Sequence, residues 1–228
     1  MVKFETAEIA GFAPAIAGIR HALQSYDKAD SHYDNEGILH IGENDYDLAK
    51  RLINSNGDSH SKFLRQIEVW VNITAPRFWW AEFDTYKIAT TANSQSTMHT
   101  LIKTSITKEN IGMPWGLDPT IDSAMENLIY DIDCIINFYK SMDENKELKD
   151  KYFEAIKAML PEGFLQTRMI SLNYQVLRNM YEQRKTHRLS GWNKDFVEWV
   201  HTLPLSEWIT NEWPEYQEQS QETVVDSE

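Results

Sequence analysis

Residues Val71–His99 read VNITAPRFWWAEFDTYKIATTANSQSTMH, and the rest of the chain can be organised around this stretch. Four aliphatic residues at every second position predict a half-buried strand that leads into it, namely Ile67, Val69, Val71 and Ile73. Pro76 then predicts the start of a helix, because proline is tolerated in a first helical turn. That helix would carry four aromatic residues, Trp79, Trp80, Phe83 and Tyr86.

An uncharged run follows this helix. The twelve residues 88–99 contain no Asp, Glu, Lys or Arg, although charged residues make up 25% of the chain. A segment of this kind can present hydroxyls, amides and backbone N–H groups to a ligand. The alternative is an ordinary Ser/Thr-rich connection between a helix and the next element.

Length and composition narrow the class of protein. A chain of 228 residues suits one domain, which we predict over residues 1–211, followed by an acidic, flexible tail over residues 212–228. The net charge of −13 argues against binding to nucleic acid or to an acidic membrane surface. The apolar runs are too short to span a membrane, so we expect a cytoplasmic protein.

Cysteine and histidine usage adds two expectations. The single Cys134 excludes an intramolecular disulfide, and its aliphatic neighbours predict a buried, inert thiol. The histidines lack the spacing of a metal site, so we predict no bound metal.

Helical periodicity and capping signals predict the remaining elements. The expected helices run from about Ile16 to Tyr26, from a cap at Asp45 to Asn54, from Asp118–Pro119 to about Lys140, from Asp143 to about Leu160, from about Leu165 to Arg184, and onward from about Asn193. In a helix running from Leu165 to Arg184, Asn173 and Arg184 would lie about 20° apart on one face and could line one pocket.

The stretch Val71–His99 resembles the signature region of flavin-dependent thymidylate synthases. Ala75, Pro76 and Phe78 match its opening, and Asn93 and Ser96 match its later Asn and Ser. Four positions differ or only partly agree. The family reads Arg-His-Arg where this chain has Thr85, Tyr86 and Lys87, and its closing Arg is Met98 here.

A second segment extends the resemblance. Leu160–Asn173, LPEGFLQTRMISLN, is similar to a family segment that leads into a helix with ligand contacts. Asn173 and Asn179 then stand at positions that contact the flavin, and Arg184 at one that contacts the uracil ring. Gln175 stands where the family has an Arg. Ser25 matches a Ser that touches the flavin, and His60 or Ser61 stands near another flavin position.

The resemblance implies an α/β (α+β) fold like that of the thymidylate-synthase-complementing proteins, with an antiparallel or mixed sheet and long helices. It also implies a homotetramer, and eight Trp make large interfaces plausible. The implied reaction is the reductive methylation of dUMP to dTMP, or a related pyrimidine-nucleotide reaction. FAD would be the cofactor, with NADPH and methylene-tetrahydrofolate as co-substrates.

The same resemblance implies the roles of individual residues. The flavin contacts would be Ser25, Lys87, Asn93, Asn173 and Asn179. The nucleotide contacts would be Ser96, Gln175 and Arg184. Among them, Arg184 would act catalytically by hydrogen-bonding the uracil carbonyl and favouring negative charge on the ring.

The missing cations leave a second hypothesis open. A hydrogen bond to a charged group contributes about 1.5–3 kcal/mol, so losing two or three would lower phosphate affinity by about 10²- to 10⁵-fold. The alternative is therefore a non-catalytic nucleotide-binding or structural protein that keeps the fold without binding FAD or dUMP phosphates. Trp79 and Trp80 could stack on a flavin or base, but their helical spacing favours a place in the core.

Overall fold

The strand before Pro76 forms where the alternation predicts it. β4 spans Glu68–Pro76, and every second residue before Pro76 is buried, namely Val69, Val71, Ile73 and Ala75; Pro76 at the end of the strand is buried as well. The chain then enters α3, Arg77–Phe83, with Pro76 as the residue that precedes the first turn. The expected strand and helix start are confirmed. Tyr86 lies beyond the end of α3, so its placement in the aromatic helix was wrong.

The computed structural model describes residues 1–55, 59–103, 105–143, 145–214 and 219–221. The strands are β1 Lys3–Ala10, β2 His32–Tyr33, β3 Leu39–Ile41, β4 Glu68–Pro76, β5 Thr90–Ser94, β6 Leu165–Asn173 and β7 Gln219–Gln221. The helices are α1 Phe12–Arg20, α2 Glu43–Ile53, α3 Arg77–Phe83, α4 Thr97–Thr100, α5 Pro119–Ser141, α6 Lys146–Met159, α7 Tyr174–Arg184, α8 Val197–His201 and α9 Glu207–Thr210. One of the short 3-10 helices is η3, Lys62–Gln66. A π-helix covers Gly191–Phe196.

Two sheets organise these strands in a mixed α+β fold with antiparallel sheets and long helices, as predicted. The larger sheet has the strand order β1-β4-β6-β5, so β1 and β5 are its edges. The smaller sheet has the order β2-β3-β7. Its strands are antiparallel, with His32 opposite His40 and Leu39 opposite Gln221.

The chain divides into two compact units that alternate along the sequence. The first unit contains residues 1–3, 74–85 and 94–168, and the second contains residues 4–73, 86–93 and 169–228. The expectation of a single domain over 1–211 stays a prediction. Of the acidic tail, Gln219–Gln221 forms β7, while residues 215–218 and 222–228 lie outside the described residues, so the flexible tail also stays a prediction.

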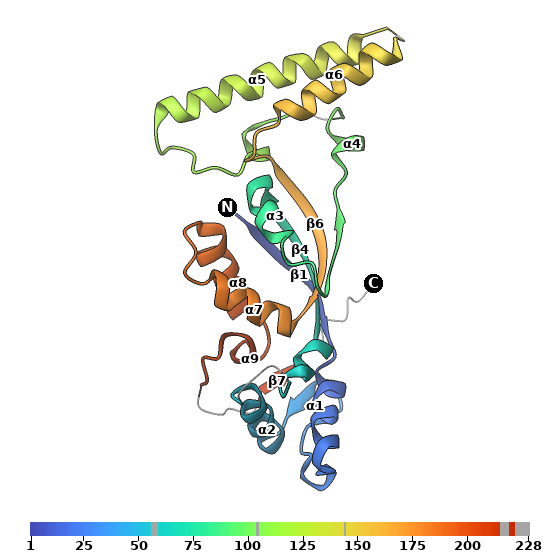
Figure 1. The fold of residues 1–228 in the computed structure, drawn as a ribbon, viewed down its shortest axis with the longest axis vertical. Coiled ribbons are helices and arrows are strands. Elements are labelled where there is room, and N and C mark those ends of the chain that lie inside the picture. Colours follow the sequence, from blue (N-terminus) through green and yellow to red (C-terminus); the bar gives the residue numbers. More distant parts are fainter. Residues whose placement is uncertain (56–58, 104, 144, 215–218, 222–228) are drawn as a thin grey trace. The chain divides into compact units, whose positions relative to one another are not determined.

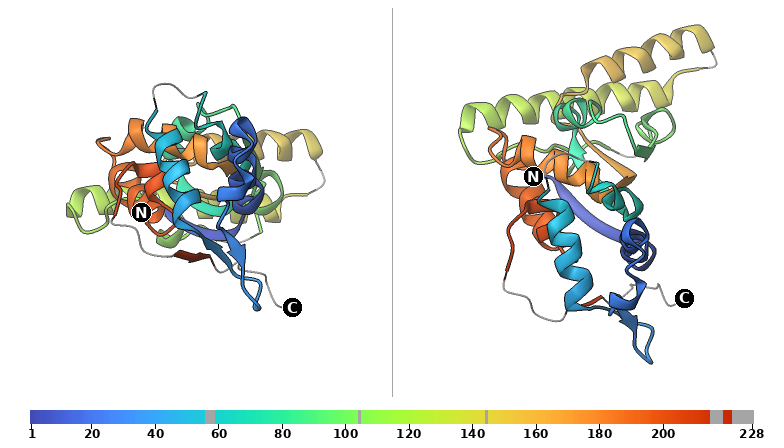
Figure 2. Two further views of the ribbon diagram at one scale, coloured as in Figure 1. Left: turned by 90° about the horizontal axis from the view of Figure 1, so that it is seen from below. Right: turned by 60° about the horizontal axis from the view of Figure 1, so that its bottom comes forward.

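The first unit contains a helical hairpin of α5 and α6, which run side by side in Figure 1 and in the views of Figure 2. Asp118 caps α5 by accepting a hydrogen bond from the amide of Thr120, which confirms the predicted start. The hairpin buries Ile129, Ile132, Ile136 and Ile156. Ile121 and Leu148, although apolar, are exposed on this hairpin. The cap of α6 is Asn145 rather than Asp143.

Trp79 and Trp80 are buried within this unit, with 0% and 1% of their surfaces exposed. Their rings meet edge to face at 5.1 Å, and Trp79 stacks on Phe83. The indole of Trp80 donates to the carbonyl of Gln166, and the guanidinium of Arg168 lies 4.1 Å above its ring. These contacts confirm a core role for both tryptophans.

The expected helix from Leu165 to Arg184 was wrong in its first half. Residues Leu165–Asn173 form strand β6, and only Tyr174–Arg184 are helical. In the strand, Ile170 and Leu172 are buried with a period of two. Pairing with β4 and β5 therefore overrides a sequence in which Leu165, Met169 and Leu172 also fit a helical period.

Cys134 is exposed, so its prediction as a buried thiol was wrong. Ile132 and Ile136 of α5 are buried, whereas Tyr130, Cys134 and Phe138 lie one turn apart on its exposed side. The neighbouring isoleucines thus mark the opposite side of the helix rather than the surroundings of the thiol.

We expect Cys134 to react with Ellman's reagent in the native chain almost as fast as in urea-unfolded chain, because an exposed thiol needs no opening of the fold. The measurement is the absorbance of the released thionitrobenzoate over time. Reaction only after unfolding would contradict the exposed position.

A buried ion pair holds the N-terminal part of the second unit. Arg20 and Asp45 are 4% and 1% exposed, and Nη2 of Arg20 lies 2.6 Å from Oδ1 of Asp45. The other carboxylate oxygen accepts from the amides of Asp30 and Ser31. Asp45 is the third residue of α2, so its prediction as the helix cap was wrong, and Gly42 precedes the first turn. The pair joins α1 and α2 to the loop between them.

Removing one partner of this pair leaves the other charge buried. We expect Arg20→Met to lower the free energy of unfolding by about 3–5 kcal/mol, and Arg20→Met/Asp45→Leu to recover much of that loss. Urea unfolding followed by circular dichroism checks both values. A double variant no more stable than the single one would contradict the assignment.

The pair also predicts a pH dependence. Burial raises the pKa of the Asp45 carboxyl, but hydrogen bonds from Ser31, Arg20 and Asp30 outweigh this effect and hold the pKa below its ordinary value of 3.8. A folded-state pKa below the unfolded one stabilises the fold above about pH 4, and this contribution is lost as the pH falls through the folded pKa. We expect wild-type stability to fall more steeply below pH 4 than that of Asp45→Asn, as measured by urea midpoints.

Candidate functional site

The junction between β6 and α7 positions most of the residues that the resemblance implicates. Asn173 ends β6 and caps α7, because its Oδ1 accepts a hydrogen bond from the amide of Val176 at 3.1 Å. The next amide, that of Tyr174, donates to the carbonyl of Ile67 at 3.0 Å. Asn173 is 4% exposed, so the cap lies in the interior of the second unit.

This junction sets the separation of Asn173 and Arg184. Asn173 precedes the first turn of α7 and Arg184 is its last residue. A rise of 1.5 Å per residue separates them by about 16 Å along the helix axis. The expectation that both could line one pocket therefore stays a prediction. They could contact only different parts of an extended ligand.

Gln175 takes part in a polar network. Its Oε1 accepts from the hydroxyl of Ser61 at 3.2 Å, and its Nε2 donates to Oδ1 of Asn179 at 3.2 Å. Gln175 and Ser61 are buried, whereas Asn179, one turn further along α7, is exposed. A neutral amide suits this position because an Arg side chain here would bring a charge into the interior.

Arg184 lies between two aromatic rings at the end of α7. Its Nε donates to the hydroxyl of Tyr86 at 2.9 Å, and that hydroxyl donates to Oε1 of Gln183 at 3.0 Å. The guanidinium carbon lies 5.5 Å from the centre of the Tyr86 ring and 4.9 Å from that of Trp192. We call Tyr86, Arg184 and Trp192 the arginine cluster. It fixes the plane of a cation whose charge stays on at any physiological pH.

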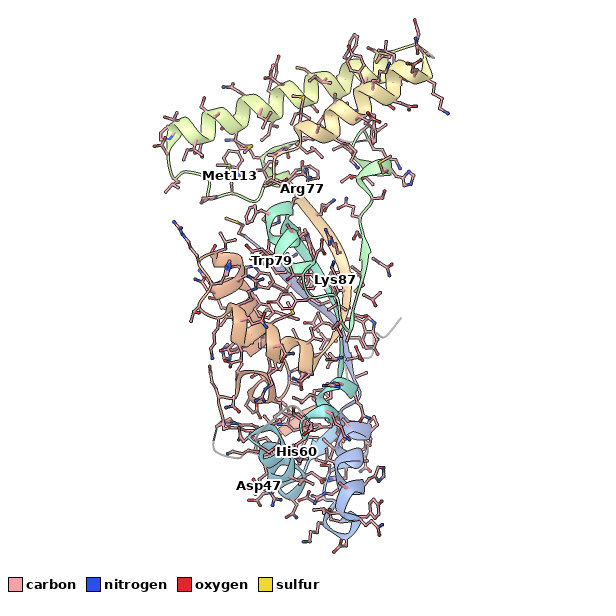
Figure 3. All side chains as sticks on the ribbon, viewed as in Figure 1. Asp47, His60, Arg77, Trp79, Lys87 and Met113 are labelled. Atoms are coloured by element: carbon pink, nitrogen blue, oxygen red, sulfur yellow. The ribbon has the colours of Figure 1, made fainter. Side chains whose placement is uncertain are left out.

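A tight turn brings Tyr86 to this cluster. The hydroxyl of Thr90 donates to the carbonyl of Tyr86, and Ala89 has a φ of +56°. Positive φ is uncommon for alanine and often marks a constrained segment. Lys87, labelled in Figure 3, is exposed in this turn just before β5.

The other predicted ligand residues lie in three places. Asn93 is exposed near the end of the edge strand β5. Ser25 is half-buried in the loop after α1, where its amide donates to the carbonyl of Arg20 and its carbonyl accepts from Lys28. Ser96 is exposed, precedes α4 and belongs to the first unit.

The structure thus brings together Arg184 with Tyr86, and Gln175 with Asn179. Trp192 was missed by sequence reasoning, because the π-helix that carries it follows a non-helical segment. The signal that could have found it is a Trp four residues after the basic run Arg184–Arg188. His60, a predicted neighbour of the flavin position, is exposed before η3.

Two tyrosines of α7 have raised pKa values. Burial and the nearby Glu207 raise the pKa of Tyr174 well above its usual range. Burial and a hydrogen bond to Glu212 raise the pKa of Tyr181 to about 12. Both hydroxyls therefore remain protonated donors over the physiological range, Tyr174 to the carbonyl of Pro204 and Tyr181 to Glu212.

Within the described residues, no group of three or more His, Cys, Asp or Glu side chains could hold a metal ion. In the same part of the chain, every helix is too short or too polar to cross a membrane.

Comparison with solved structures identifies the fold. The chain resembles thymidylate synthase X (ThyX) from Helicobacter pylori with FAD and dUMP, at a TM-score of 0.67 and 16% identity, covering 93% of this chain and 98% of that one. A second structure of the same flavin-dependent enzyme from Helicobacter pylori, complexed with FAD and dUMP, gives a TM-score of 0.61 and 18% identity, with 92% and 98% covered. No protein-family model and no curated protein sequence matches the chain.

The arginine cluster makes a testable contribution to stability. We expect Tyr86→Phe to lower the free energy of unfolding by about 1 kcal/mol, because it removes the hydroxyl bonded to both Arg184 and Gln183. Tyr33→Phe, exposed in β2, is the matched control and should change stability by less than about 0.5 kcal/mol. Equal effects of the two variants in urea unfolding would show that the Tyr86 hydroxyl stabilises nothing.

Proposed function

We propose that this protein is a divergent flavin-dependent thymidylate synthase-like enzyme that binds FAD and a pyrimidine nucleotide. The observation that carries the proposal is the extent of the fold match, which covers 93% of this chain and 98% of a ThyX chain. A match over nearly the whole of both chains leaves few elements of either fold without a counterpart. The fold alone does not define a reaction, so the proposal also depends on the residues of the site.

The residues present fit the neutral parts of a flavin. Lys87, Asn93 and Asn179 are exposed in the second unit, and Ser25 is half-buried there. Amide and hydroxyl donors suit the ring carbonyls and ribityl hydroxyls of FAD, and Lys87 supplies one cation for its pyrophosphate. We propose these four residues and Asn173 as flavin contacts. Bound FAD would supply the hydride for the reductive step.

Arg184 is the proposed catalytic group. The bond from its Nε to Tyr86 and the ring of Trp192 hold the guanidinium in one orientation. A guanidinium held in this way is preorganised to stabilise negative charge that develops on a pyrimidine carbonyl. We propose that Arg184 contacts the nucleotide base and that Ser96 contacts the nucleotide as well. Gln175 would contact the nucleotide only by exchanging its bond to Ser61 or to Asn179.

The remaining proposals depend on the resemblance alone. They are reductive methylation of dUMP to dTMP or a related pyrimidine-nucleotide reaction, NADPH and methylene-tetrahydrofolate as co-substrates, and a homotetramer. The cytoplasmic location, expected from the short apolar runs, also stays a proposal. The preference for nucleotide over nucleic acid agrees with the net charge of −13.

Flavin binding is the first test. We expect the purified chain to show a flavin absorption spectrum, or to take up added FAD with quenching of flavin fluorescence. Most of the proposed flavin contacts are uncharged. We therefore expect the affinity for FAD to depend only weakly on salt concentration. Failure to take up FAD at high micromolar concentration would instead favour the non-catalytic protein with the same fold.

Nucleotide binding tests the role of Arg184. We expect Arg184→Ala to weaken dUMP binding by 10-fold or more, because a charge-assisted hydrogen bond contributes about 1.5–3 kcal/mol. Arg188→Ala is the matched control, since Arg188 is exposed four residues further along and has no assigned role. Isothermal titration calorimetry measures both affinities, and circular dichroism verifies the fold. Equal dUMP affinity in the two variants would remove Arg184 from the site.

A further inference from the structure

Two histidines face each other across the small sheet of the second unit. His32 of β2 and His40 of β3 are directly paired in the antiparallel register. Their ring centroids are 5.4 Å apart, and their ring planes differ by 17°. Paired residues of antiparallel strands project to the same face, so the two side chains are neighbours although they are eight residues apart in sequence.

Each imidazole already uses one nitrogen with an oxygen that can only accept. Nε2 of His40 lies 2.9 Å from Oδ2 of Asp34, and Nδ1 of His32 lies 3.4 Å from the carbonyl of Asp30. These two nitrogens therefore carry the protons in the neutral rings. Nε2 of His32 and Nδ1 of His40 then have the lone pairs that a metal ion needs.

This arrangement is the one that orients histidine ligands in metal sites. A ligating imidazole usually donates its other N–H to a carboxylate or a backbone carbonyl, which fixes the tautomer and the ring orientation. The Asp34 carboxylate is itself positioned, because its Oδ1 accepts from the amides of Glu36 and Ile38. The loop between β2 and β3 thus supports His40 through Asp34.

The spacing of the rings also fits one ion. A tetrahedral ion with Zn–N bonds of about 2.0–2.1 Å places the centroids of two imidazole ligands about 5 Å apart. The observed 5.4 Å is close to that value, and it also lies within the range of about 4.5–7 Å for offset aromatic pairs. The spacing of the pair is therefore compatible with one ion bound by both rings.

We propose that His32 and His40 bind one divalent transition-metal ion of the kind that prefers imidazole, such as Zn²⁺. Imidazole nitrogen suits Zn²⁺, Cu²⁺ and Ni²⁺, while Mg²⁺ and Ca²⁺ prefer oxygen ligands. His32 is exposed and the His40 side chain is 23% exposed, so water can occupy the other coordination positions. Asp34 acts as a positioning residue through His40. The site is separate from the arginine cluster and does not depend on flavin or nucleotide binding.

Isothermal titration calorimetry of the full chain with ZnCl₂ near pH 7.5 tests the site. We expect one Zn²⁺ per chain, with His32→Gln and His40→Gln each weakening the affinity 10-fold or more. His99→Gln, which removes an exposed histidine from α4, is the matched control and should leave the affinity unchanged. An affinity that stays the same in His32→Gln, or that falls equally in His99→Gln, would overturn the proposal.

A second readout distinguishes coordination from misfolding of a variant. Long-range ¹H–¹⁵N spectra of the wild-type histidine rings should show ZnCl₂ shifting Nε2 of His32 and Nδ1 of His40. Asp34→Asn should lower the Zn²⁺ affinity by about 10- to 100-fold, as removal of such supporting partners typically does. Shifts confined to other histidines, or no ring shifts at saturating ZnCl₂, would show that this pair does not ligate the metal.

Discussion

The hydrogen bond between the side chain of Asn173 and the amide of Val176 fixes the point at which β6 becomes α7. An alternative end of the strand would shift the register of every residue on the helix. With the cap at Asn173, Gln175 falls in the interior beside Ser61, Asn179 reaches the surface one turn later, and Arg184 ends the helix. The arrangement of the candidate site therefore follows from one capping interaction at the end of a buried strand.

The site combines a neutral interior with a confined cation. Gln175 satisfies its amide through Ser61 and Asn179, so no charge is buried at the start of α7. Arg184 instead lies at the end of α7, where a positive charge also interacts favourably with the helix dipole. Its contacts with Tyr86 and Trp192 limit its rotamers, and a preorganised donor loses less entropy on binding a ligand.

Local signals in the sequence predicted the elements that depend on local rules. The alternation in β4 and the Asp118–Pro119 start of α5 both appear in the structure. The segment Leu165–Asn173 was misassigned because its strand conformation depends on pairing with distant strands. For the site, resemblance supplied Arg184 but not its aromatic neighbour Trp192. Contacts between residues of different elements have no periodicity that a single sequence reveals.

The π-helix Gly191–Phe196 has a consequence for how this protein can vary. A π-turn contains one residue more than an α-turn, so the orientation of the Trp192 indole depends on the number of residues before it. Deleting one residue between Leu189 and Trp192 would rotate the indole by about 100° around the helix axis and take it off the guanidinium of Arg184. Related chains that differ in length at this point would thus lose the stacked ring even where both side chains are the same.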